Sequence, residues 1–60
     1  MYNKLVVWYY DMVSETETRF TYELKDIEGM VTRGGFLVIN FKDGSETRNK
    51  LIDIRLEFEE

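Results

Sequence analysis

Carboxylates are the side chains in this sequence whose number and spacing come closest to those of a chemical site. Glu15 and Glu17 stand two positions apart, and Glu57, Glu59 and Glu60 crowd the end of the chain. Paired carboxylates act as general acids and bases or bind hard cations. They also form the solvated face and charged end of a strand, where they keep a sheet edge from aggregating. We favour that second role and assign no carboxylate to a catalytic or metal site.

The other groups that enzymes use are missing or have no partner. The chain contains no histidine and no cysteine, which excludes Ser-His pairs, thiol nucleophiles and the usual nitrogen and sulfur metal sites. Ser14 and Ser45 have no base at a useful spacing. Gly29 and the Gly34-Gly35 pair do not make a phosphate-binding loop, because no helix follows to offer its N-terminal amides. We therefore expect a protein with no enzymatic activity, no cofactor and no metal.

Length and charge limit the functions that remain. We expect a single domain over residues 1–60, with a marginal core, because a chain this short buries only about 60% of its unfolded surface. Without disulfides or a metal, self-association is the remaining way to supplement that core. The net charge of −4 disfavours binding to a nucleic-acid backbone. No apolar run of membrane-spanning length and no secretory signal stands out, so we expect a cytoplasmic protein without membrane contact.

The elements that must position any site are strands. Residues 16–24 and 52–58 alternate apolar and polar side chains with a period of two, which predicts half-buried strands. Residues 4–12 are rich in β-branched and aromatic side chains, which favour a pleated surface. The polar residues between the first two strands predict an antiparallel connection. A helix could not present the alternating residues as one face, and the connection between the first two strands is too short to hold a helix.

Glycines mark the turns of the second half. Gly34-Gly35 suits a two-residue hairpin loop between strands at 30–33 and 36–42, after a turn at 25–29. Asp43-Gly44 is the strongest hairpin signal in the chain. We predict an all-β fold, a small antiparallel meander of five to six strands that forms a half-barrel or an open curled sheet, with little or no helix.

The loop length at Asp43-Gly44 decides which face of the neighbouring strands is buried. A two-residue loop would set apolar side chains opposite charged ones, pairing Phe41, Ile39 and Leu37 with Glu46, Arg48 and Lys50. A three-residue loop with a bulge at Gly44 sets the same side chains opposite Ser45, Thr47 and Asn49. We favour the bulged loop because a slip of one residue moves every side chain to the other face, and charges belong in water. A bend at Asn49-Lys50 would then precede the last strand.

Two segments are apolar on both of their faces, and this surplus is the main indication of function. They are residues 5–10 and 36–39. The sheet either curls enough to cover both faces, or pairs with a second copy, or binds a different protein. We predict an interface on the even-numbered side of these segments, made by Val6, Trp8, Tyr10, Phe36 and Val38.

These features favour a small, acidic, non-enzymatic binding protein. We expect a homodimer that acts as an inhibitor or adaptor of a larger protein, either by presenting carboxylates or by adding a strand to a sheet edge. In size, charge and architecture the chain resembles the small accessory proteins of bacteriophages and mobile elements, many of which inhibit host enzymes or defence systems. That resemblance involves no sequence motif.

Two other functions are open at this point. Tyr9, Tyr10 and Arg33 could line the mouth of a dimer or barrel and hold a small ligand such as a nucleotide. The aromatic residues could also stack the bases of a single-stranded nucleic acid. The second function is disfavoured because no basic residues are interleaved with the aromatic residues of the first strand.

Overall fold

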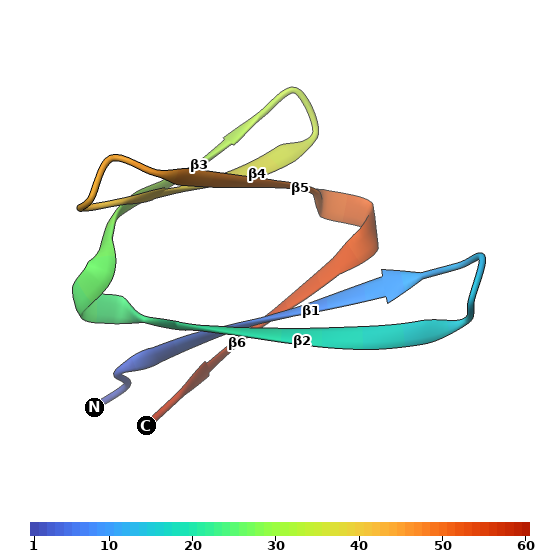
Figure 1. Cartoon of the computed structure of the whole chain (residues 1–60), viewed down its shortest axis with the longest axis horizontal. Coiled ribbons are helices and arrows are strands. Elements are labelled where there is room, and N and C mark those ends of the chain that lie inside the picture. The colour runs from blue at the N-terminus through green and yellow to red at the C-terminus, as the bar shows by residue number, and fades with distance from the viewer.

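The computed structural model describes residues 1–60 as six antiparallel strands in two sheets (Figure 1). Sheet A has the order β2-β1-β6, with β1 at Lys4–Asp11, β2 at Thr16–Glu23 and β6 at Ile54–Glu59. Sheet B has the order β3-β4-β5, with β3 at Ile27–Arg33, β4 at Phe36–Phe41 and β5 at Glu46–Lys50. The only helical segments are two short 3₁₀ turns, η1 at Leu24–Asp26 and η2 at Leu51–Asp53. The predicted small all-β antiparallel fold is confirmed.

The glycine pair forms the two-residue hairpin loop that the sequence predicts. Gly34 and Gly35 have φ angles of +56° and +80°, and Arg33 pairs directly with Phe36. Positive φ at both central residues is the signature of the hairpin turn whose twist matches that of the flanking strands. Glycine adopts these angles without a steric penalty. The loop therefore fixes which residues of β3 lie beside which residues of β4.

The second hairpin of sheet B has the bulged register. The amide of Phe41 donates to the carbonyl of Ser45 over 2.9 Å, and the amide of Gly44 donates back to the carbonyl of Phe41 over 3.0 Å. Gly44 has a φ of +92°, as a bulge glycine requires. Ile39 lies opposite Thr47. The three-residue loop is confirmed, and it keeps charged side chains off the inner face of β4.

Two boundaries differ from the sequence prediction. The bend before the last strand is not at Asn49-Lys50, which belong to β5, but at η2. Ile52 is therefore not part of an alternating strand; it lies in η2 and is 91% exposed. Residues 25–29 are only partly a turn, because β3 already begins at Ile27 and carries a bulge between Ile27 and Gly29. Backbone bends that are made by 3₁₀ turns without glycine or proline leave little trace in a sequence.

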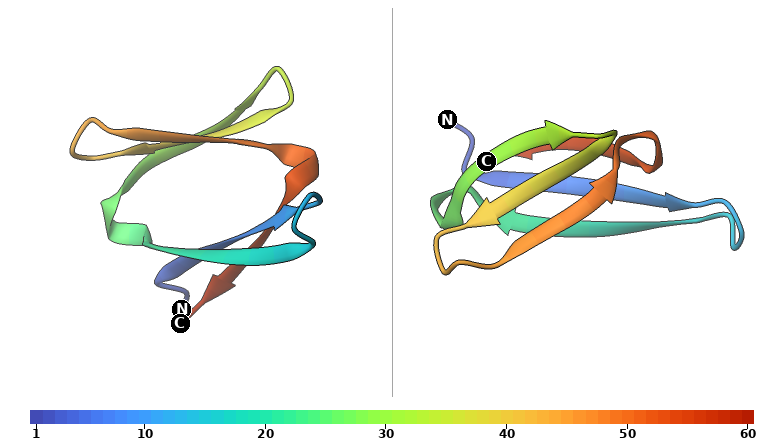
Figure 2. Two further views of the ribbon diagram at one scale, coloured as in Figure 1. Left: turned by 45° about the vertical axis from the view of Figure 1, so that its right-hand side comes forward. Right: turned by 90° about the horizontal axis from the view of Figure 1, so that it is seen from above.

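The last strand returns to pair with the first, which makes β1 the central strand of sheet A. Val7 lies between Phe20 of β2 and Leu56 of β6. The two ends of the chain lie together as a result (Figure 2), and the terminal amino group contacts the Glu60 carboxylate at 2.9 Å. β1 is therefore flanked on both sides by strands that carry long charged residues.

The core lies between the inner faces of the two central strands. Leu5 and Val7 of β1 pack with Leu37 and Ile39 of β4, and none of the four is more than 4% exposed. The strands of sheet B run obliquely across those of sheet A (Figure 2), so the sheets cover one another best at their centres. Apolar side chains on the edge strands are only partly covered: Tyr22, Leu24, Ile27, Phe41 and Ile54. The core is small, as expected for a chain of this length.

Candidate functional site

The residues predicted to form one interface lie on two separate surfaces. Side chains alternate across a strand, so the residues between those of the core point outward from each sheet. Val6, Trp8 and Tyr10 lie on the outer face of sheet A, whereas Phe36 and Val38 lie on the outer face of sheet B. We call these surfaces the Trp8 face and the Phe36 face. They cannot form one continuous contact area within a single copy of the chain.

On the Trp8 face, side chains of the edge strands cover the central strand. Arg19 of β2 and Glu59 of β6 form an ion pair of 2.6 Å. Arg19 lies beside Trp8, and Glu59 lies beside Lys4, so the ion pair crosses over the residue between them, Val6. Val6 is fully buried. It therefore offers no contact surface to a partner in this structure.

Trp8 is held between two arginines. The guanidinium carbons of Arg19 and Arg55 lie 5.5 Å and 5.2 Å from the centre of its ring, within the range of cation–π attraction. Its indole N–H donates to the Glu57 carboxylate, and Arg55 also contacts Glu17 at 3.8 Å. Every polar and charged group around Trp8 thus has a partner within the chain. Only Tyr10, at the end of this row, stays exposed (43%).

The Phe36 face has the same register of an aromatic residue between two cations, but neither of these cations contacts a carboxylate. Phe36 lies directly between Arg33 of β3 and Lys50 of β5, as Trp8 lies between its two arginines. Phe36 is 39% exposed. The four ion pairs of the protein involve neither Arg33 nor Lys50. Two cations beside an accessible aromatic ring are therefore left without a counter-charge.

The rest of the Phe36 face is apolar and basic. Val38, only 8% exposed, lies between Val31 and Arg48. Arg48 contacts Glu46 at 3.3 Å, the one carboxylate on this face. The face therefore carries an excess of positive charge in a protein whose net charge is −4. This local charge is the opposite of what the whole composition indicates.

Two shallow hollows adjoin Phe36. One, of about 200 Å³, runs along the outer face of sheet B beside Val31, Arg33 and Val38. The other, of about 450 Å³, leads from Phe36 and Lys50 toward Tyr9 and Phe20 of sheet A. Phe20 is 44% exposed. An extended segment of another molecule could thus contact the ring of Phe36 and the flanking cations at once.

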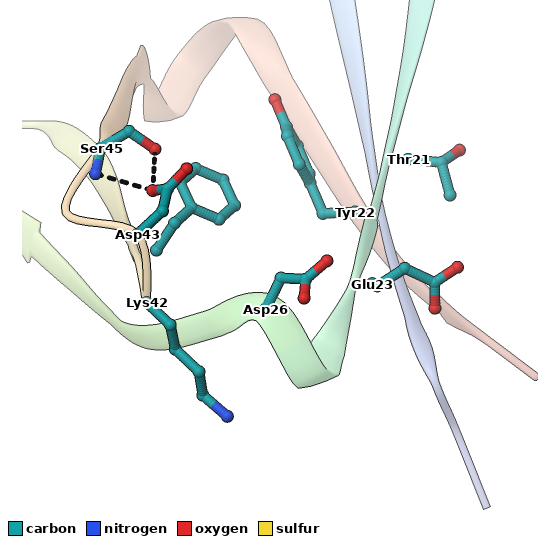
Figure 3. Close-up of a pocket in the computed structure, with 8 residues that line it drawn as sticks. Thr21, Tyr22, Glu23, Asp26, Lys42, Asp43 and Ser45 are labelled. Carbon is teal, nitrogen blue, oxygen red and sulfur yellow. Dashed lines mark hydrogen bonds between the residues drawn. The ribbon is translucent and has the colours of Figure 1, made fainter.

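The largest hollow of the molecule lies at the other end and has a different character. It has a volume of about 760 Å³ and lies between β2, η1 and the β4–β5 turn; its lining includes Tyr22, Glu23, Asp26, Phe41, Lys42 and Asp43 (Figure 3). The ring centres of Tyr22 and Phe41 are 5.3 Å apart. Figure 3 shows Lys42 pointing away from Asp43. None of the carboxylates here forms an ion pair, the chain has no histidine or cysteine to act beside them, and we assign them no chemistry.

One carboxylate in this hollow has a perturbed pKa. The hydroxyl and the backbone amide of Ser45 donate to Asp43 over 2.6 Å and 2.9 Å. The Ser45 hydroxyl, followed by the Ser45 amide, lowers the pKa of Asp43 below its ordinary value, because both bonds stabilise the charged form. These bonds stabilise the turn that sets the register of β5. The effect is structural.

The residues of the alternative small-ligand site are not brought together. Tyr9 borders the hollow between the two sheets, Tyr10 lies on the Trp8 face, and Arg33 lies on the Phe36 face. No group of three or more acidic side chains is arranged to hold a metal ion. No helix is long and apolar enough to cross a membrane. The geometry therefore favours the Phe36 face as the candidate binding surface.

The sequence predictions include Phe36 and Val38, and Arg33 for the alternative ligand, but they do not place Lys50 beside Phe36. The signal is present in the two hairpins. A two-residue loop at Gly34-Gly35 sets Phe36 opposite Arg33, and the bulged loop at Gly44 sets Phe36 opposite Lys50. Applying both registers together would have located this site.

Comparison with known proteins gives no relative for this chain: no protein-family model, no curated protein and no solved structure matches it. The functional argument therefore depends on the residues and geometry described above.

Proposed function

We propose that this chain is a non-enzymatic binding protein, an adaptor or inhibitor that holds an acidic segment of a larger protein on its Phe36 face. One observation carries the proposal: Arg33 and Lys50 flank the exposed ring of Phe36, and neither has a carboxylate partner within the chain. Aromatic residues, phenylalanine included, and arginine are enriched at protein interfaces. The unpaired cations favour a partner that supplies carboxylates.

An acidic protein segment fits this face better than a nucleic acid does. A nucleic-acid strand is a long polyanion, and the remainder of the protein, with its net charge of −4, would repel it outside the Phe36 face. A short extended peptide can place its carboxylates at Arg33 and Lys50 and an apolar residue on Phe36. The face is small, so we expect a dissociation constant on the order of micromolar.

The test compares two double variants that change the net charge equally. Arg33→Glu with Lys50→Glu removes both cations of the Phe36 face. Lys25→Glu with Lys42→Glu, at exposed positions away from that face, is the matched control. Binding is measured by fluorescence anisotropy with a labelled peptide that alternates glutamate and leucine, and with a labelled oligothymidine of similar length.

We expect the acidic peptide to bind the unmodified chain and the control, and to lose at least tenfold in affinity for the Arg33/Lys50 variant. Binding of the peptide by the control and the Arg33/Lys50 variant alike would show that the Phe36 face is not the site. Tighter binding of the oligothymidine, with affinity falling steeply as salt rises, would favour a nucleic-acid binder. Absence of binding to either probe at low salt would remove the proposal.

A further inference from the structure

We infer that two copies of this chain associate through the free edge of β3, so that their B sheets join into one continuous antiparallel sheet. The inference does not depend on the proposed function, because it rests on the free backbone edge of β3, although Val31 and Arg33 also belong to the Phe36 face. β3 pairs only with β4, and its other side meets no strand. An uncovered strand edge is a template for another strand.

The free backbone groups of β3 belong to Met30 and Thr32. In the two-residue hairpin the carbonyl of Arg33 accepts from the amide of Phe36, so Arg33 directs its backbone groups toward β4, as do Val31 and every second residue before it. The residues between, Met30 and Thr32, direct their amides and carbonyls outward. None of the hydrogen bonds outside the strand ladders involves either residue. These groups are ready to pair with a second strand.

β3 is the one edge strand of the protein that carries no charge along its middle. The other three edge strands have charged residues at alternate positions on their outer faces: Glu17, Arg19 and Glu23 on β2, Glu46, Arg48 and Lys50 on β5, and Arg55, Glu57 and Glu59 on β6. Charges at an edge oppose pairing with another chain. Between Glu28 and Arg33, by contrast, β3 presents Met30 and Val31, each 41% exposed. Three edges are protected and one is left open.

A second copy is the occupant that this edge fits best. The two charges that border the open stretch, Glu28 and Arg33, have opposite signs, and antiparallel pairing of two identical strands brings the Glu28 end of each near the Arg33 end of the other. A twofold axis at Val31 sets Val31 against Val31 of the second copy and Met30 against Thr32 of the second copy. The apolar row Val38–Val31 then continues across the interface. Both exposed apolar residues of β3 become covered.

Neighbouring registers are less favourable. An axis at Met30 would set Ile27 opposite Arg33 of the second copy, and an axis at Thr32 would set Val31 opposite that same arginine. With the axis at Val31, Arg33 of the second copy lies opposite Gly29. No atom lies within 4 Å of the position that a Cβ of Gly29 would take, so the arginine side chain has room there. The register centred on Val31 therefore pairs the two Val31 side chains with each other and sets no apolar side chain opposite Arg33.

Sedimentation velocity on the full chain tests association through this edge. We expect the unmodified protein to sediment as a dimer. Val31→Lys should convert it to a monomer, because two lysines would meet directly at the twofold axis. Thr21→Lys adds the same charge to the β2 edge and should leave the dimer intact. A monomeric unmodified protein, or a Val31→Lys variant that stays dimeric, would overturn the inference.

Disulfide trapping tests the register and does not require a destabilising change. In the proposed pairing the Cα atoms of the two Val31 residues are about 4.5 Å apart, which is within the range of a disulfide. Since the chain has no native cysteine, Val31→Cys should form a covalent dimer under mild oxidation. Arg33→Cys, on the same strand and face, should not, because the two copies of residue 33 would lie four residues out of register. Equal cross-linking of the two variants would contradict the register, and far-UV circular dichroism confirms that both are folded.

Discussion

The outer faces of the two sheets share one strand register but differ in the contacts that their cations make. In each, an aromatic residue of the central strand lies between two cations of the edge strands: Trp8 between Arg19 and Arg55, and Phe36 between Arg33 and Lys50. In sheet A the cations stack on the ring and contact glutamates. In sheet B no carboxylate pairs with Arg33 or Lys50.

The difference arises from what else the edge strands carry. On the Trp8 face, β6 supplies Glu57 and Glu59 in alternation with Arg55. On the Phe36 face, β3 supplies only Gly29 and Val31 before Arg33. An aromatic residue between cations is therefore no sign of a binding site by itself. What distinguishes the two faces is whether the cations beside the aromatic ring have carboxylate partners within the chain.

The largest effect is expected from the core that both faces share. Ile39→Ala should destabilise the protein by about 2 to 5 kcal/mol, since Ile39 is fully buried. A domain of this size has a total stability of only a few kcal/mol, at roughly 0.05–0.15 kcal/mol per residue, so the variant should be largely unfolded by circular dichroism. Ile52→Ala, at the exposed η2 turn, is the control and should change stability by less than about 0.5 kcal/mol.

Truncating the two aromatic residues should separate the faces directly. Trp8→Ala should cost about 2 kcal/mol of stability, because the side chain is half-buried and stacks with two arginines. Phe36→Ala should cost less than about 1 kcal/mol but weaken binding of the acidic peptide on the order of thirtyfold, or about 2 kcal/mol. Urea denaturation followed by circular dichroism and peptide anisotropy measure the two effects. Equal loss of stability in both variants would mean that Trp8 and Phe36 contribute equally to stability, which would contradict the contrast between the two faces.

A smaller effect is expected from the ion pair that covers Val6. Glu59→Gln should destabilise the protein by roughly 0.5 kcal/mol, since the side chains of Arg19 and Glu59 are 44% and 38% exposed and solvent screens them. The loss should shrink as salt concentration rises. A double-mutant cycle with Arg19→Gln measures the coupling. A coupling energy of zero would show that Val6 is covered by packing alone.

The smallest effect concerns the turn that sets the register of the Phe36 face. Ser45→Ala should raise the pKa of Asp43 toward its ordinary value, because the hydroxyl is the main cause of its lowering. A lowered pKa in the folded state stabilises the protein above the unfolded value, and this stabilisation is lost as the pH falls through the folded pKa. The variant should therefore lose less stability on acidification below the ordinary aspartate range. An NMR titration of the Asp43 carboxyl carbon, compared with that of exposed Asp26, tests this; an unchanged Asp43 pKa would assign the shift to the backbone.

Much of the fold followed from local patterns. Gly34, Gly35 and Gly44 have positive φ, and turns with such angles can be predicted from the positions of glycine. Alternation along the strands identified the inner residues. The positions of η1 and η2 were not predicted, because 3₁₀ turns without glycine or proline lack a strong local signal. The predicted interface agrees only in part with the face that we propose binds a partner. Phe36 and Val38 lie on that face, whereas Val6 is buried by side chains from two other strands.

The sequence by itself determined most of the strands and, in sheet B, the two hairpin loops and their registers, because those depend on residues that are close along the chain. Only the tertiary structure decided that β6 lies beside β1, and with it that Arg19 meets Glu59, forty positions away. Contacts across such a separation depend on which strands the whole chain places together, and no local pattern encodes that choice. The same choice brought the glutamates of β6 to the arginines beside Trp8, and no strand brought a carboxylate partner to Arg33 or Lys50.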